Sequence, residues 1–166
     1  DTRGIGVNPS GTDFLRGTKD FGRRTIQVEP TRYEQIEPFI HDADFVIFNF
    51  GNIDDIDPEA IIRVKQTSKA FVYVDVHRKP FGADKDGYMY PRGWDRWEEY
   101  LAHADAVQMN KDECRVLFKK NISDVEGFVE CAAAVLDTGA RHAIITLRNQ
   151  GLILAHRTPA DEYVHI

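Results

Sequence analysis

The residues Asn110-Lys-Asp-Glu113 place an amide and a carboxylate three positions apart, directly after the short apolar run 106–109. The residues that follow, 114–118, have the pattern of a helix. Polar groups at the carboxyl end of a strand in an open α/β sheet lie where such sheets bind ligands, and the N–H groups at a helix start attract phosphate. A carboxylate there requires a cation between itself and a phosphate, and Mg²⁺ is the usual one. The segment is therefore a candidate magnesium and phosphate site.

The same two residues also have a purely structural interpretation, as the cap of a helix. Asn110 is a favoured N-cap residue, and Glu113 stands where a capping box has Glu or Gln. Such a cap stabilises a helix by about 1 kcal/mol without any ligand. Taken alone the segment favours the cap, so a functional role depends on the other residues that the fold brings beside it.

The rest of the chain alternates between short apolar runs and helical patterns. We expect strands at 45–50, 70–74, 106–109 and 143–147, separated by helices at 58–68, around 94–101, at 111–118 and at 125–138. The run 45–50 is almost continuously apolar, as in a strand covered on both faces. This alternation predicts an α/β fold, a Rossmann-like three-layer α/β/α arrangement with a mainly parallel sheet, over residues 31–166. Residues 1–30 are predicted to form a small β flap.

Each expected strand ends in polar residues, which a parallel sheet would gather along one edge. They are Asn49 and Asn52, Asp75 and His77, Asn110 and Glu113, and Thr146. Loops are polar in any protein, so polarity alone indicates little. This particular mixture suits a magnesium nucleotide.

Three segments in this order resemble the ribokinase-like (PfkB) family of carbohydrate and nucleoside kinases. They are Asp75-Val-His-Arg78, the stretch from Ala104 to Glu113, and the stretch from His142 to Gly151. The resemblance covers roughly residues 20–166, the central portion of such an enzyme. It implies transfer of the γ-phosphate of ATP to a hydroxyl of a sugar or nucleoside, with ATP and Mg²⁺ as cofactors.

The resemblance also implies roles for individual residues. Asn110 and Glu113 would organise Mg²⁺ and the triphosphate through water, and Thr146 would lie near the nucleotide phosphates. Asp75, His77 and Arg24 would lie on the substrate side, Arg24 as part of a lid strand over the sugar.

Departures from the family pattern are as informative as the matches. Arg148 stands where the family has glycine, so its side chain would either crowd the nucleotide or contribute charge to it, and His77 and Lys79 stand where the family has Asn and Arg. No Gly-Ala-Gly-Asp segment is present, so the catalytic base is expected outside this chain and no catalytic residue is assigned in it. We expect the chain, which ends at Ile166 inside an expected strand, to be part of a longer protein and inactive alone.

Composition narrows the function further. The 166 residues carry a net charge of −6, which argues against broad nucleic-acid binding, and no apolar run is long enough for a membrane span. Cys114 and Cys131 lack metal-type spacing and favour a cytoplasmic protein.

A homodimer formed through the flap strands is a further expectation from the resemblance. Two alternatives stay open: a non-catalytic α/β module that binds a nucleotide or a protein, and another doubly wound enzyme. A dinucleotide dehydrogenase is disfavoured, because no Gly-x-Gly-x-x-Gly follows a strand.

Overall fold

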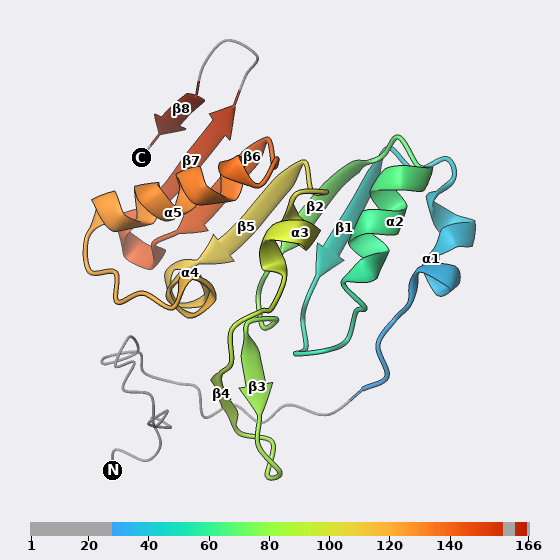
Figure 1. The fold of residues 1–166 in the computed structure, drawn as a ribbon, viewed down its shortest axis with the longest axis horizontal. Helices are drawn as coiled ribbons and strands as arrows, with labels where there is room; N and C mark the ends of the chain where they lie inside the picture. The colour runs from blue at the N-terminus through green and yellow to red at the C-terminus, as the bar shows by residue number, and fades with distance from the viewer. Residues whose placement is uncertain (1–27, 158–161, 166) are drawn as a thin grey trace.

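The computed structural model describes residues 28–157 and 162–165 (Figure 1). Along the chain its elements are α1 (Tyr33–Ile40), β1 (Phe45–Asn49), α2 (Glu59–Thr67), β2 (Phe71–Asp75), β3 (Phe81–Ala83), β4 (Met89–Pro91), α3 (Trp97–Leu101), β5 (Ala106–Asn110), α4 (Lys111–Phe118), α5 (Val125–Asp137), β6 (His142–Thr146), a 3₁₀ turn (Arg148–Gln150), β7 (Leu152–Arg157) and β8 (Glu162–His165).

The main sheet has the order β1-β2-β5-β6-β7-β8. Strands β1, β2, β5 and β6 are parallel, while β7 and β8 are each antiparallel to the strand before them. The register sets Asn49 beside Asp75, Asp75 beside Gln108, and Asn110 beside Thr146. The predicted α/β fold with a mainly parallel sheet is confirmed, and the carboxyl ends of the parallel strands lie along one edge.

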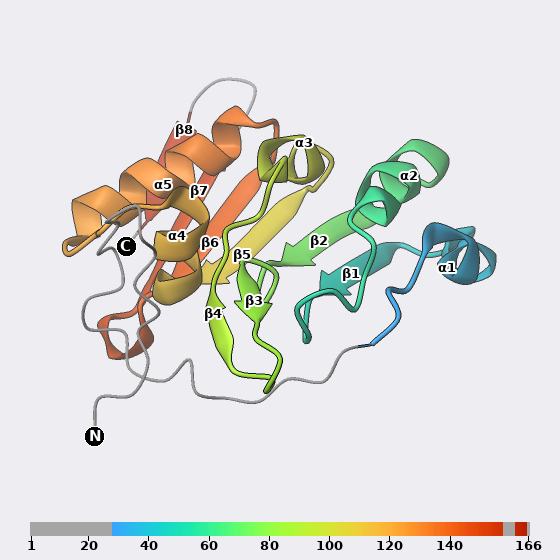
Figure 2. The same cartoon turned by 60° about the horizontal axis from the view of Figure 1, so that its bottom comes forward.

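The described helices cover one face of this sheet. Figures 1 and 2 show α2, α3, α4 and α5 on the same side, as right-handed crossovers require when successive parallel strands are added in one direction. The core lies between these helices and the sheet, where Val72, Val74 and Ile145 are fully buried. The described residues thus supply two of the three expected layers, the sheet and one layer of helices.

Strand β1 departs from the prediction that both of its faces are covered. Phe48 is buried on the helical face, but Phe45 and Ile47, which alternate with it, are 62% and 65% exposed. The reason is position, because β1 is the edge strand and no described helix covers its second face. An apolar run of this kind does not distinguish a strand buried on both faces from an edge strand of such a sheet.

Other local differences also have simple causes. The segment between β2 and α3, for which the sequence pattern predicts no strand, contains the antiparallel pair β3–β4, which extends beyond the carboxyl edge of the main sheet (Figure 1). Gly82 fits this hairpin because a Cβ there would lie 2.5 Å from the ring of Tyr90. Helix α1 has Arg32 as its N-cap residue, and Thr31 before it forms an isolated bridge with Ile56.

Two predictions fall on the N-terminal part of the chain. The flap over residues 1–30 and the lid residue Arg24 lie almost entirely outside the described residues, so they stay predictions, as does the domain boundary at residue 30. Within the described ranges the longest helix, α5, has 13 residues, and no helix has the length and apolar character needed to cross a membrane.

Candidate functional site

The junction between β5 and α4 forms a complete capping box, with both of its reciprocal hydrogen bonds present. Asn110 Oδ1 accepts hydrogen bonds from the backbone N–H groups of Asp112, at 2.8 Å, and Glu113, at 3.0 Å. In return Glu113 Oε2 accepts the backbone N–H of Asn110 at 2.7 Å. The capping interpretation is confirmed. It also means that two of the N–H groups expected to attract a phosphate are already occupied.

Glu113 is buried at this junction, with 4% of its surface exposed. Burial raises the pKa of its carboxyl, and the hydrogen bonds from His77 and Asn110 offset this only in part. Nδ1 of His77 lies 3.5 Å from Glu113 Oε1. The hydrogen bond with Glu113 raises the pKa of His77 despite the partial burial of the imidazole. The carboxylate is therefore held between the start of its own helix and the loop that follows β2.

Asp75, at the end of β2, faces the next strand. With its nitrogen turned toward Asp75, the Gln108 amide donates to the two carboxylate oxygens at 2.7 and 3.2 Å. Burial raises the pKa of Asp75, against the opposing influence of the nearby His77. Because Asp75, Gln108 and Asn110 alternate with buried residues of their strands, their side chains lie on the sheet face that the described helices leave open.

Thr146 and Arg148 complete the same edge. Thr146 pairs with Asn110 in the β5–β6 register. Two residues later, Arg148 adopts a left-handed backbone with a φ of 59°, and its guanidinium lies 2.5 Å from Asp112 Oδ2. The fold thus brings together the predicted site residues Asp75, His77, Asn110, Glu113, Thr146 and Arg148. Arg24 lies outside the described residues.

The structure adds a cluster that the sequence reasoning did not assign. Lys79 is 6% exposed, and its ammonium lies 2.8 Å from Asp54 Oδ1. Arg92 donates to both oxygens of Asp54 at 3.1 and 3.2 Å. Burial acts to raise the pKa of Asp54, but the hydrogen bonds from Arg92 and Lys79 outweigh it, so the pKa lies below its ordinary value. The departure of Lys79 from the family pattern was the one signal in the sequence.

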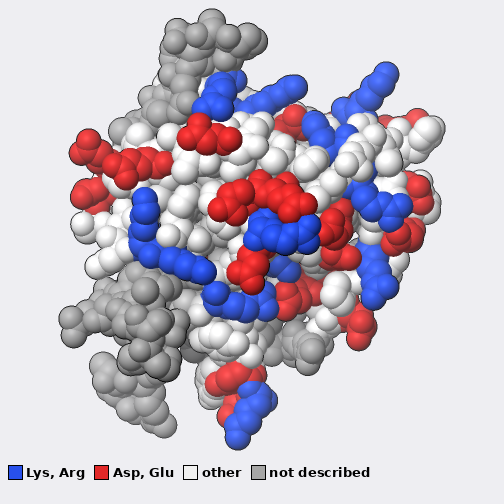
Figure 3. Space-filling model, viewed as in Figure 1, with Lys and Arg blue, Asp and Glu red and all other residues white. Residues whose placement is uncertain are grey.

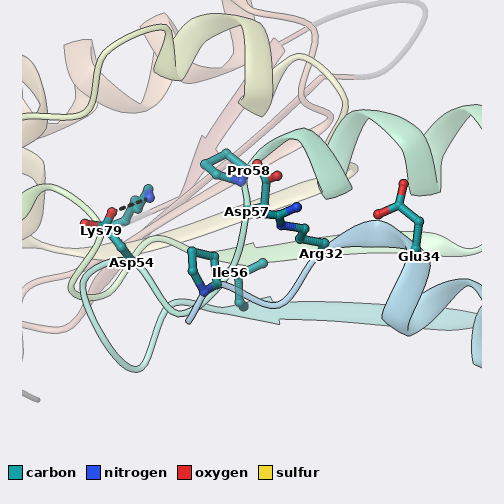
Figure 4. A pocket seen from close by; sticks show the side chains of 8 residues that line it. Arg32, Glu34, Asp54, Ile56, Asp57, Pro58 and Lys79 are labelled. Carbon is teal, nitrogen blue, oxygen red and sulfur yellow. Dashed lines mark hydrogen bonds and ion pairs between the residues drawn. The ribbon is translucent and has the colours of Figure 1, made fainter. Parts of the chain in front are cut away.

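An open depression of about 480 Å³ lies beside this cluster (Figure 4). It is lined by Pro30, Arg32, Glu34, Asp54, Ile56, Asp57, Pro58 and Lys79. Asp57 is partly used as a cap, since its Oδ1 accepts the N–H of Glu59 at 3.1 Å. The residues gathered around Glu113 do not line this depression. On the face shown in Figure 3 acidic and basic side chains are interspersed, without a continuous basic surface.

The side chains around Glu113 can be tested against the chemistry of Mg²⁺. They offer carboxylate, amide and hydroxyl oxygens, the hard ligands that this ion prefers. Within the described part of the chain, however, no three His, Cys, Asp or Glu side chains gather closely enough to hold a metal. Since Mg²⁺ keeps several waters and is usually bound by one or two carboxylates together with phosphates, the residues fit an ion that arrives with a phosphate chain.

Comparison with solved structures shows proteins of the same fold. A pyrophosphate-dependent kinase in the ribokinase family, in complex with a pyrophosphate analogue and myo-inositol, superposes with a TM-score of 0.62 at 17% identity; the match covers 84% of this chain and 46% of that one. Pyridoxal kinase from Leishmania donovani gives 0.55 at 19% identity, covering 79% and 49%. Ribokinase from Thermotoga maritima gives 0.54 at 15% identity, covering 79% and 38%. The chain therefore spans less than half the length of each of these proteins.

Sequence comparison assigns the family. No curated protein matches the chain significantly. The family model described as "pfkB family carbohydrate kinase" matches residues 9–165, which is almost the entire chain. The solved structures named above share the fold that this match implies. The chain belongs to the pfkB family of carbohydrate kinases.

Proposed function

We propose that this chain forms part of an ATP- and Mg²⁺-dependent kinase that transfers the γ-phosphate to a hydroxyl of a sugar or nucleoside. The observation that carries the proposal is the gathering of Asp75, Asn110, Glu113 and Thr146 at one edge of the sheet, where open α/β folds bind their ligands. Belonging to the pfkB family supports the same activity.

Each residue then has a distinct task. Glu113 would orient the waters of a Mg²⁺ ion, and the backbone N–H of Asn110 keeps its carboxylate in place. Bound Mg²⁺ would supply charge neutralisation for the phosphates. The hydroxyl of Thr146 would donate to a phosphate oxygen, and Asp75, oriented by Gln108, would accept a hydrogen bond from the acceptor substrate. Such catalysis rests on positioning and electrostatic stabilisation, together with a base for the acceptor hydroxyl.

The base is the missing part of this mechanism. The sequence contains no Gly-Ala-Gly-Asp segment, and we assign no base among the described residues. We therefore expect the chain to bind MgATP without turnover. Pyridoxal and myo-inositol are named with the structural neighbours, so an acceptor screen should include a cyclic polyol beside pentoses and nucleosides. The cytoplasm is the proposed location, because Cys114 and Cys131 are free thiols.

The substitution Glu113→Gln tests the proposal. It removes the charge needed beside Mg²⁺ but keeps an oxygen that can accept the N–H of Asn110. We expect MgATP binding, measured by calorimetric titration, to weaken at least about tenfold, as for a lost charge-assisted interaction, while the fold is kept. Glu126→Gln, which changes an exposed first-turn glutamate of α5, is the matched control.

A second function is favoured by one observation. Glu113 is already occupied by Asn110 and His77, so a structural role accounts for its position. On that view the chain is a non-catalytic α/β module that binds a nucleotide or a protein. This alternative predicts that ligand affinity is indifferent to Mg²⁺, and that Glu113→Gln lowers the melting temperature without changing ligand binding.

A further inference from the structure

Arg148 occupies a backbone conformation that does not suit it. Its φ of 59° lies in the left-handed region, in the turn between β6 and β7. A side chain with a Cβ is strained there, whereas glycine is not. Strain of this kind persists where the surrounding structure or a function requires it. The conformation therefore calls for a reason that local folding does not supply.

The ion pair with Asp112 is a weak reason. Asp112 Oδ1 already receives the guanidinium of Arg115 at 3.0 Å, and this pair is largely buried. Arg115 is fixed in turn by its hydrogen bond to the carbonyl of Ile122 at 2.8 Å. The Arg148 side chain is 62% exposed whereas Asp112 is 14% exposed, so solvent screens the arginine side of this pair and reduces its contribution to stability. Arg148 is thus a second cation on a carboxylate that has its partner.

The guanidinium of Arg148, the second cation at Asp112, belongs to the loop that directly follows the strand end carrying Thr146. Arg148 follows Thr146 by two residues, and Thr146 lies beside Asn110 in the sheet. On the other side of the same helix start, Glu113 contacts His77, which also has a positive φ, of 37°. His77 and Arg148, two loop residues with a strained backbone, therefore each place a basic group beside a carboxylate of α4. His77 contacts Glu113, and Arg148 contacts the preceding residue, Asp112. Arginine in such a place can bind phosphate oxygens with two parallel hydrogen bonds.

We propose that Arg148 binds the phosphate chain of the phosphoryl donor, resting on Asp112 while the site is empty and moving to the phosphates when it is filled. Of the two roles open to Arg148 from the sequence, charge contribution is then the correct one and crowding of the nucleotide is not. The inference rests on the proposed function, because it assigns the ligand of the same edge. The recognised chemistry is a diphosphate or triphosphate chain, which ATP and inorganic pyrophosphate share.

The test is calorimetric titration of the chain with ATP and, separately, with sodium pyrophosphate, each with excess MgCl₂. Arg148→Gly removes the guanidinium and relieves the backbone strain, so its melting temperature should equal or exceed that of the unsubstituted chain. We expect both ligands to bind about tenfold to a hundredfold more weakly. Arg148→Lys keeps the charge and should retain part of the affinity. Arg141→Gln, at the opposite end of β6 and also exposed, should leave binding unchanged.

The outcomes separate this inference from the proposed function. If the unsubstituted chain binds neither MgATP nor magnesium pyrophosphate, the proposed function is wrong. If it binds them and Arg148→Gly binds both equally well, or binds ATP more tightly, the inference alone is wrong. If Arg148→Gly loses affinity for pyrophosphate alone, the inference is supported and pyrophosphate is identified as the phosphoryl donor that Arg148 binds. A loss confined to ATP contradicts it, because Arg148 would then recognise the nucleoside.

Discussion

Asn110 and Glu113 form a reciprocal pair at the start of α4. The amide oxygen of Asn110 accepts hydrogen bonds from two helix N–H groups, and Glu113 Oε2 accepts the backbone N–H of Asn110 at 2.7 Å. The same pair would face Mg²⁺ in the proposed kinase. Structural and functional interpretations therefore predict the same geometry and differ only in what happens when one partner is changed.

Removal of the Asn110 cap should affect both stability and ligand binding. Asn110→Ala deletes the acceptor for the N–H groups of Asp112 and Glu113, so we expect the free energy of unfolding to fall by about 1 kcal/mol. It also removes the side-chain amide nitrogen that donates to Glu113 Oε1, so that of the contacts from Asn110 only its backbone N–H remains to orient the carboxylate, and MgATP affinity should fall. Urea unfolding and calorimetric titration measure the two effects.

The cap of α5 provides the matched control. Asp124 Oδ1 accepts the N–H of Gly127 at 2.9 Å, away from the site. Asp124→Ala should cost a similar amount of stability, about 1 kcal/mol, and leave MgATP binding unchanged. Equal losses of binding in the two variants would mean that affinity only follows stability, and the special role of Asn110 would be excluded.

The contact between His77 and Glu113 predicts a pH dependence of stability. His77 faces Glu113, Asp75 and Arg78, and the hydrogen bond with Glu113 raises its pKa above 6.5. A folded-state pKa above the unfolded value stabilises the fold at low pH, and this contribution is lost as the pH rises through the raised pKa. Glu113, whose pKa burial also raises, acts in the same direction at lower pH.

The variant His77→Asn isolates the contribution of the imidazole. The difference in unfolding free energy between the unsubstituted chain and this variant should decrease as the pH rises above about 6.5. Chemical unfolding at several pH values measures it. A difference that stays constant, or that grows with pH, would show that His77 does not gain a proton-linked partner on folding.

The sequence alone was sufficient to predict the helices and strands that are determined by local residue patterns. Period and length predicted α4, α5 and the parallel strands, and the capping box at Asn110 could be recognised because its residues lie three apart. The alignment of strand ends followed from the handedness of βαβ connections. This is why Asp75, Asn110 and Thr146 could be assigned to one edge before their distances were known.

Features that depend on contacts distant in sequence were not predictable in this way. The exposure of Phe45 and Ile47 follows from the place of β1 at the edge of the sheet, which its apolar pattern does not encode. The pair β3–β4 consists of strands of three residues, too short for a periodic signal. The contact between Lys79 and Asp54 spans 25 residues and depends on how two loops meet.

That contact carries the last prediction. Lys79 is almost fully buried, whereas the side chain of Asp54 is 51% exposed and also binds Arg92. Asp54→Ala would leave a buried ammonium without its partner, and we expect it to cost about 3 kcal/mol. Lys79→Met would leave Asp54 half-exposed and paired with Arg92, so it should cost only about 1 kcal/mol. Thermal unfolding of the two variants measures which substitution lowers the stability more. If Lys79→Met is the more damaging, the ammonium of Lys79 stabilises this cluster by more than its pairing with Asp54, through its position over the ring of Phe50, 5.5 Å from the ring centroid.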